Sequence, residues 1–353
     1  MRKILAYECK KNGNFAIVIL LLLLLGYKGI VCFQYSEAYD THYIEIMDEY
    51  ISEVKDMKSE EAIKHLQVKK KESENWKEQA VLKHLLEQTG DIKYYENVKT
   101  NAKKGSVITI NMPLDYMNHM DLYAKYPEPV LINQIGWNTF FELNKYNLLP
   151  LVCILMFSTI ISNERENGMY KIIKSSSYGY QRLIRDKFIL VLSVSFLIFH
   201  LNFIIDVILS NWVYPLKDLD KPLSSIHPSM LTDESILSFF LRFYFIGLLY
   251  TAFLSLLIII VSSLVHNNRI ALTVNVLFFS IFFAVSMVLP DAKWIVIPFI
   301  GSNITLFNNT SIMYFNALGK FSLEMIISVF YIIGVLILSM LFMWKEKNTH
   351  RIS

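Results

Sequence analysis

The stretch FYFIGLLYTAFLSLLIIIVSSLV, residues 243–265, contains no charged side chain over 23 positions. A helix of this length reaches about 34 Å at roughly 1.5 Å per residue, enough to cross the hydrocarbon layer of a bilayer, roughly 30 Å thick. The chain has 353 residues and is 54% hydrophobic, so several such helices are expected. The six stretches that we predict to cross the membrane are 15–34, 146–162, 188–209, 243–265, 270–289 and 324–344. The predicted fold class is an all-α membrane protein with six transmembrane helices.

The first and second stretches are less regular than the others. Basic residues precede the first, as in a secretory signal peptide, but no small-x-small cleavage site follows, which favours a retained helix. Lys28 is expected to snorkel outward from it. The second has only 15 clearly apolar residues, 148–162, so its helix is predicted to begin earlier, within FELNKYN at 141–147.

The distribution of charge predicts the orientation. With six spans both termini lie on one side, and positive charge is enriched on the cytoplasmic side. If the termini are cytoplasmic, the cytoplasmic pieces carry 14 basic and only five acidic residues. These pieces are the amphipathic N-terminal segment 1–14, the loops 163–187 and 266–269, and the tail 345–353. We therefore predict a multi-pass protein of the plasma membrane with both termini in the cytoplasm, and the abundance of Lys, Ile and Asn favours a bacterial source.

This orientation places residues 35–145 outside the cell as one large domain after the first span. Apolar residues recur every three or four positions between Tyr39 and Met57, which predicts an amphipathic helix. The charged break KKKESE follows, and a second helix is predicted from Trp76 to about Gln88, stopped by Gly90. GSVITINM, residues 105–112, is a candidate short strand. The external domain is therefore expected to be mostly helical.

The cytoplasmic loop 163–187, NERENGMYKIIKSSSYGYQRLIRDK, contains the short amphipathic run MYKIIK. Such a run fits a short helix that docks on a partner protein. It fits equally well a solvated basic loop that lies on anionic membrane lipids. Periodicity does not separate these two interpretations.

The same loop resembles the signature segment of type-2 ATP-binding-cassette exporter permeases. In that family a span ends in Glu-x-Glu-x-Gly, a short coupling helix follows, and a Ser-rich turn leads to a Lys at the start of the next span. The matching residues are Glu164, Glu166, Gly168, Ser175–Ser177 and Lys187. The sequence departs from the pattern at Ser177, where Pro is usual, and at Tyr180, where Arg is common. The match covers about 25 residues, and the layout of spans is also similar.

The resemblance implies that this chain forms the membrane pathway while a separate ATPase subunit hydrolyses ATP. The residues that it assigns to contact with the ATPase are Glu164, Glu166, Gly168, Met169, Tyr170, Ile172 and Ile173. Glu164 and Glu166 either contact the partner or cap the coupling helix, where the helix dipole favours acidic groups. ATP and Mg belong to the partner, since the chain has no G-x-x-x-x-G-K-[ST] motif and no cofactor of its own is expected. Six spans resemble half of a pathway, so a second permease is expected, identical or related.

Polar residues within the third span are candidates for the substrate pathway. They are His200, Asn202 and Asp206. Ionisable groups inside a membrane are costly and are commonly functional. The alternative for Asp206, which we favour from the sequence, is an interfacial carboxylate capped by water; for His200 a hydrogen-bonded packing role is as plausible as substrate contact. Asn202 and Asp206 are four residues apart and are expected to share a helix face. Asn275 in the fifth span is expected to bond a neighbouring helix.

The sequence carries no common catalytic signature, such as H-E-x-x-H or G-x-S-x-G. His42 and Glu45 are two potential metal ligands, but on a charged helix such residues usually belong to the surface. We therefore expect neither an enzyme nor a metal protein, and no nucleic-acid partner. The leading hypothesis is the permease subunit of an exporter whose cargo is an amphipathic peptide or antibiotic. The alternative is a signalling or immunity protein whose external domain binds a ligand and whose loop recruits a cytoplasmic partner.

Overall fold

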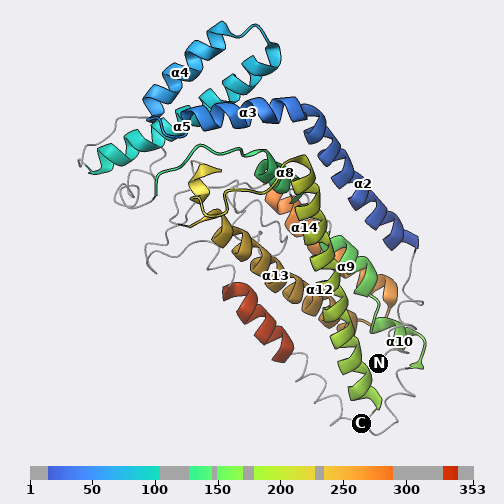
Figure 1. Cartoon of the computed structure of the whole chain (residues 1–353). Coiled ribbons are helices and arrows are strands. Elements are labelled where there is room, and N and C mark those ends of the chain that lie inside the picture. The colour runs from blue at the N-terminus through green and yellow to red at the C-terminus, as the bar shows by residue number, and fades with distance from the viewer. Residues whose placement is uncertain are drawn as a thin grey trace. The chain divides into compact units, whose positions relative to one another are not determined.

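The computed structural model describes residues 15–103, 127–144, 149–169, 179–226, 234–288 and 329–340. Regular structure within these ranges is helical apart from one isolated bridge between Pro222 and Ser235 (Figure 1). The chain divides into two compact units, which we describe separately. The first unit holds residues 1–29, 144–206 and 243–353, and the second unit holds residues 30–143 and 207–242. The predicted strand at 105–112 lies outside the described residues.

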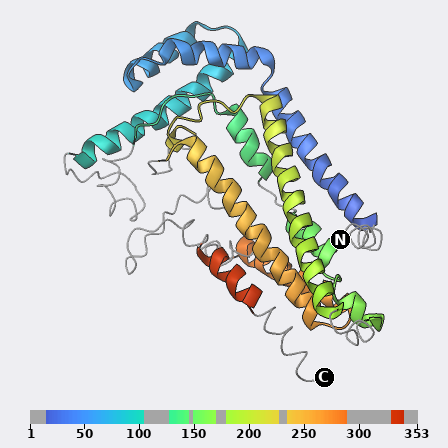
Figure 2. The same ribbon diagram turned by 60° about the horizontal axis from the view of Figure 1, so that its bottom comes forward.

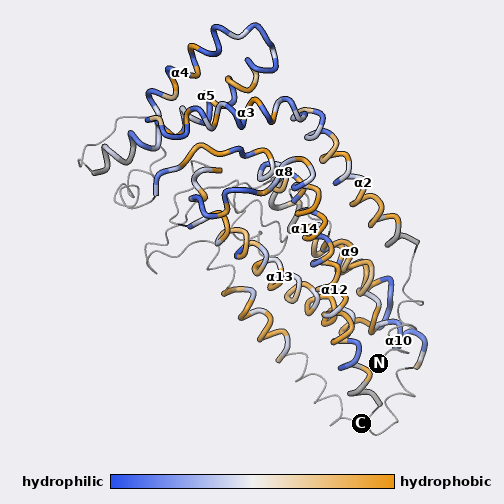
Figure 3. The backbone as a smooth tube through the Cα atoms, viewed as in Figure 1, coloured by the Kyte–Doolittle hydropathy of each residue, from blue (hydrophilic) through white to orange (hydrophobic). Residues whose placement is uncertain are grey.

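Within the part of the chain that the structure describes, three helical stretches are long and apolar enough to cross a membrane. They are Ile135–Glu166, Arg185–Val213 and Ile236–Leu264. The second belongs to α12 (Gly179–Val213) and the third is α13 (Ile236–Leu264), the two long helices shown in Figure 2. Both are predominantly apolar along most of their length (Figure 3). The chain therefore has the helical, transmembrane character that the apolar stretches predict.

The remaining apolar helices are α2 (Phe15–Ala38), α14 (Asn268–Val288) and the helix Val329–Met340. Each falls within or around one of the other predicted spans. Asn268–Ile281, within α14, and Val329–Met340 are apolar helical stretches, but each has only 10–17 residues. Six spans thus stay a prediction, while three stretches have the required length and composition.

The predicted second span, 146–162, is interrupted in the structure. It lies in the stretch composed of α8 (Ile135–Asn144), α9 (Leu149–Phe157) and the short α10 (Ser162–Glu166). Residues 158–161 form a turn, so α9 ends five residues before the predicted boundary. The apolar sequence of this region hid the turn, because the groups that stabilise it come from other helices.

The second unit contains three amphipathic helices: α3 (Thr41–Val54), α4 (Ser59–Glu72) and α5 (Trp76–Lys103). Asp40 caps α3 by accepting a hydrogen bond from the Tyr43 amide at 2.9 Å. The core of this bundle includes the fully buried side chains Met47, Leu66, Val81, Leu82 and Leu85. The predicted helices around Tyr39–Met57 and from Trp76 are present, but an unpredicted helix, α4, lies between them, and residues 69–72 of the predicted break form its last turn.

Helix α5 is longer than the sequence predicts, because it continues through Gly90 to Lys103. A glycine inside a helix costs only about 1 kcal/mol relative to alanine. Thr89 and Ile92, on either side of Gly90, are buried, so packing continues across it. The predicted stop at Gly90 was therefore wrong.

Candidate functional site

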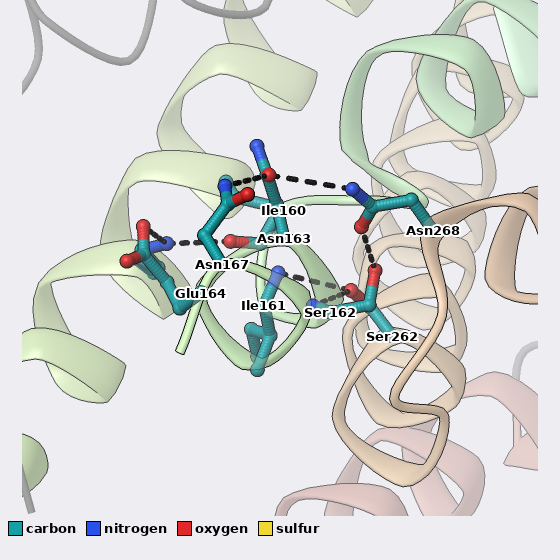
Figure 4. Close-up of polar contacts among 9 residues, drawn as sticks. Ile160, Ile161, Ser162, Asn163, Glu164, Asn167, Ser262 and Asn268 are labelled. Carbon is teal, nitrogen blue, oxygen red and sulfur yellow. Dashed lines mark hydrogen bonds and ion pairs between the residues drawn. The ribbon is translucent and has the colours of Figure 1, made fainter. Parts of the chain in front are cut away.

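The turn that follows α9 is stabilised by a buried serine of α13. Ser262 Oγ accepts hydrogen bonds from the backbone amides of Ile161 at 3.0 Å and Ser162 at 3.2 Å (Figure 4). The first amides of a helix have no partner within the helix, and here they begin the short α10. Ser262 is fully buried. A side chain 100 residues away therefore determines where the helix breaks.

The first residue of α14 completes this polar network. Asn268 Oδ1 accepts from Ser162 Oγ at 2.7 Å, and Asn268 Nδ2 donates to Asn163 Oδ1 at 3.3 Å (Figure 4). The Asn268 amide in turn donates to Glu166 Oε2 at 3.1 Å. Glu166 thus places an acidic group at the N-terminus of α14, where the helix dipole favours it. The sequence had suggested the coupling helix as the helix to be capped.

Glu164 and Lys187 form a buried ion pair between α10 and α12. Lys187 Nζ lies 2.9 Å from Glu164 Oε1, and it also donates to the carbonyl oxygen of Ile160 at 2.5 Å. Lys187 is only 1% exposed. Taking two charges out of water is costly unless they are paired and hydrogen-bonded, as they are here. Glu164 is therefore held inside the fold by Lys187, while its predicted contact with a partner or cap on the coupling helix, whose residues 170–174 lie outside the described ones, stays a prediction.

We name these residues the turn clasp: Ser162, Asn163, Glu164, Glu166, Lys187, Ser262 and Asn268. It joins the end of α9 and the whole of α10 to α12, α13 and α14. The same neighbourhood contains the bond from Asn275 Nδ2 to Ser158 Oγ at 3.1 Å, which confirms the predicted helix–helix role of Asn275. Parts of α9, α10, α12, α13 and α14 therefore meet at one polar centre.

The chain leaves the turn clasp through Gly168 and Met169. Gly168 has φ of +70°, a backbone conformation that glycine adopts without the penalty paid by other residues, so the predicted tight turn is confirmed. Met169 is 48% exposed. The other proposed coupling residues, Tyr170, Ile172 and Ile173, lie outside the described residues, as does the Ser-rich turn Ser175–Ser177.

His200 bonds on both sides of its ring. Nδ1 lies 2.6 Å from the carbonyl oxygen of Phe196, and Nε2 lies 2.6 Å from the Tyr244 hydroxyl of α13. Since a carbonyl only accepts, Nδ1 carries the proton and Nε2 accepts from tyrosine in the neutral ring. Phe199 and Phe203 pack around the same tyrosine. This geometry is that of a packing histidine between α12 and α13.

Asp206, Asn202 and Lys28 form a buried triad that joins α12 to α2. Lys28 Nζ donates to a carboxylate oxygen of Asp206 and, at 2.7 Å, to Asn202 Oδ1. Asn202 Nδ2 closes the ring by donating to Asp206 Oδ2 at 3.2 Å, as the predicted shared face requires. Lys28 is 2% exposed and Asp206 is fully buried. The predictions that Lys28 snorkels outward and that water caps Asp206 were both wrong, because the two buried ions pair with each other.

A second contact lies about one helical turn further along the same two helices. Cys32 Sγ of α2 is 3.7 Å from the carbonyl oxygen of Leu209 in α12. Residue numbers rise together in the two contacts, so α2 and α12 run parallel where they touch. The sequence indicated the cost of Lys28 and Asp206 separately, and two opposite charges inside apolar helices were a signal that they pair. Ser262 and Asn268 carried no such signal.

The described residues contain no group of three or more His, Cys, Asp or Glu side chains able to hold a metal ion. His42 and Glu45 lie on α3 of the second unit. No protein-family model, no curated protein and no solved structure matches this chain. The candidate site is accordingly defined by its geometry: a turn clasp at one end of α12 and a charged triad further along the same helix.

Proposed function

We propose that this chain is the permease subunit of an ATP-driven exporter, and that the turn clasp transmits the movement of a cytoplasmic ATPase to the membrane helices. The observation that carries the proposal is the set of bonds from the turn after α9 to α12, α13 and α14. A push on residues 163–169 would reach α9, α12, α13 and α14 through these bonds. Such a rigid connection is what a coupling segment requires.

The arrangement of α2 and α12 supports the proposed six-span topology. In that topology the first and third spans both run from the cytoplasm outward, and α2 and α12 are parallel at their contacts. The Glu164–Lys187 pair joins residues only 23 apart, as expected where two antiparallel spans meet at a short loop. With the positive charge of the loops, these contacts favour cytoplasmic termini and an external domain built on α3, α4 and α5.

The proposed assembly contains a nucleotide-binding ATPase and a second permease. ATP and Mg would be bound by the ATPase, because this chain lacks a phosphate-binding loop motif. Met169 is exposed at the exit of the turn clasp and is the described residue best placed to touch that partner. A cargo that is an amphipathic peptide or antibiotic fits a pathway of apolar helices.

Co-purification tests the proposal. The full chain, tagged at its C-terminus, is purified from native membranes in mild detergent, and the proteins that accompany it are identified by mass spectrometry. We expect a stoichiometric ATPase with a phosphate-binding loop, reduced at least tenfold by Met169→Asp, which puts a charge on an exposed coupling residue. Glu61→Ala on the exposed surface of α4 is the matched control and should retain the ATPase.

A preparation that lacks any ATPase, at wild-type yield and with intact folding, would contradict the exporter proposal. The signalling alternative would then stand, with the external helices as its ligand-binding part. A non-ATPase protein lost in Met169→Asp and retained in Glu61→Ala would identify the partner of such a receptor.

A further inference from the structure

The triad of Lys28, Asn202 and Asp206 places two charged groups inside otherwise apolar helices. Each charged group lies in a stretch that is otherwise apolar and each is almost completely excluded from solvent. If the contact between α2 and α12 served only to hold the helices together, apolar side chains would do so without the cost of desolvating two ions. Ion pairs buried among apolar helices are retained where their specificity or their breaking has a use.

The hydrogen bonds of the triad make its strength depend on both charges together. Lys28 Nζ bonds both partners, and Asn202 bridges them by accepting from the ammonium and donating to the carboxylate. Neutralising one ion leaves the other buried without a counter-charge, which is more costly than losing both. Losing one charge is therefore expected to weaken the contact more than losing both.

The residues of α2 around Lys28 differ between its two faces. Gly26 and Gly29 of α2 flank Lys28, and a Cβ atom placed on either would meet no other atom within 4 Å. Leu25 and Ile30 point away from the core, being 47% and 60% exposed. On the face of α2 that carries Lys28, Leu24, Val31 and Cys32 are buried, so apolar contacts and the polar ring together hold α2 at this level.

We propose that Lys28, Asn202 and Asp206 form a charge latch: matched charges hold α2 against α12, and the contact parts when one charge is lost. The latch is a property of this contact and does not depend on the exporter function. The latch joins two helices that continue into other parts of the fold: α2 is followed directly by α3, and α12 carries Lys187 of the turn clasp. A working cycle that shifts α12 would act on this contact.

The native cysteines allow the latch to be tested in the full chain. Cys32 is 4% exposed and faces α12 about one turn beyond Lys28, while Cys153 in α9 is completely buried away from the triad. In a Cys9→Ala background, removal of either cysteine leaves the other as a single reporter. The rate of alkylation by N-ethylmaleimide in native membranes then measures opening at the latch with Cys32 and general loosening with Cys153.

We expect Lys28→Met and Asp206→Asn each to raise the alkylation rate of Cys32 at least tenfold while leaving that of Cys153 unchanged. The exchange Lys28→Asp with Asp206→Lys should restore slow labelling, because the Asn202 amide can both donate and accept. The apolar pair Lys28→Met with Asp206→Leu should also be slow, since neither ion is left unmatched. Leu201→Asn, on the exposed face of α12, is the control for a polar substitution in this helix and should change neither rate.

Three results would overturn the latch. Unchanged Cys32 labelling in both single variants would show that the ions do not hold the contact. Parallel increases at Cys32 and Cys153 would show general unfolding. Fast labelling in both paired variants, with Cys153 protected, would show that the contact needs the native residues for their shape and not for matched charge. None of these results bears on whether an ATPase co-purifies, so the two proposals fail separately.

Discussion

Two buried ion pairs lie on α12, and they differ in what surrounds them. Lys187 near one end pairs with Glu164 and also binds the carbonyl oxygen of Ile160, at the turn after α9. Asp206, in the second half of the helix, pairs with Lys28, which lies 178 positions earlier in the chain. The third member of this ring is the side-chain amide of Asn202. The first pair stabilises broken backbone, whereas the second joins two intact helices.

Two ion pairs of the same chemistry can therefore have different structural roles. Buried backbone groups at a helix break need hydrogen-bond partners. Lys187 bonds the Ile160 carbonyl, and no apolar residue can replace that bond. Asp206 and Lys28 bond each other and the side chain of Asn202, and neither of these bonds is to a broken stretch of backbone. The Glu164–Lys187 pair is therefore expected to be indispensable to the fold, and the Lys28–Asp206 pair to be replaceable in the fold.

The largest expected effect comes from Lys187→Met. The substitution leaves the Glu164 carboxylate buried without its counter-ion and the Ile160 carbonyl without a donor, which we expect to destabilise the protein by about 3–5 kcal/mol. Thermal unfolding of the detergent-purified chain measures the loss. Arg185→Met, which changes a basic side chain exposed on the same helix, is the control and should have little effect. Equal melting temperatures for the two variants would refute the assigned role of Lys187.

Paired apolar substitutions sharpen the comparison. Lys28→Met with Asp206→Leu removes both ions of one contact and should be neutral or stabilising by about 1–4 kcal/mol relative to the wild type. Glu164→Leu with Lys187→Met removes both ions of the other, yet still strands the Ile160 carbonyl, so a loss of about 1–3 kcal/mol is expected. Thermal unfolding of the two double variants gives the comparison directly. A greater loss for the Lys28–Asp206 replacement would reverse our ranking of the two pairs.

A smaller effect is expected from Ser262→Ala, which tests the neutral part of the turn clasp. The hydroxyl accepts from two backbone amides, and its loss should cost about 1–2 kcal/mol, the usual effect of removing a helix-capping group. Ser263→Ala is the matched control, because the Ser263 hydroxyl donates to the carbonyl oxygen of Ile260 within the same helix. Hydrogen exchange at the amides of Ile161 and Ser162 should accelerate in Ser262→Ala alone. Unchanged exchange at both amides would argue against the cap.

The sequence was most informative where regularity is local. The apolar periodicity of α3 and the charged break before Trp76 predicted helices that the structure contains, because both signals act over a few residues. Gly90 misled, since the packing of its neighbours outweighs a weak preference. The turn at 158–161 was missed because Ser262, about a hundred residues further along the chain, supplies its bonds.

The candidate site was predictable in its location but not in its bonding. The resemblance of 163–187 pointed to Glu164, Glu166 and Lys187, yet it did not pair Glu164 with Lys187 or join Glu166 to Asn268. A charged residue inside a predicted span indicates a free-energy cost of burial, but it does not identify the residue that pairs with it. Pairing depends on which helices touch, and that information is distributed over the whole chain.

The smallest expected effect concerns a half-buried titratable group, His84 of α5. Burial lowers the pKa of His84 below its ordinary value of 6.5, and the nearby Glu87 offsets this only in part. The unfolded chain therefore binds a proton more readily than the folded chain. Stability associated with neutral His84 is complete above pH 6.5 and is lost as the pH falls toward the lower pKa of the folded state.

The melting temperature of the full chain should accordingly fall between pH 7.5 and pH 5, and His84→Gln should make that fall shallower. His65→Gln, on α4, is the control: it should keep the full acid loss, because His84 is still present. The effect should be smaller than those of the two ion pairs, since His84 keeps a neutral form that the 2.9 Å contact with the Gln88 amide nitrogen satisfies. An acid loss of the same size in His84→Gln and the wild type would mean that other groups cause it. The contrast with Lys187 would then rest on the ion pairs alone, since the partial burial of His84 would have no measurable effect on stability.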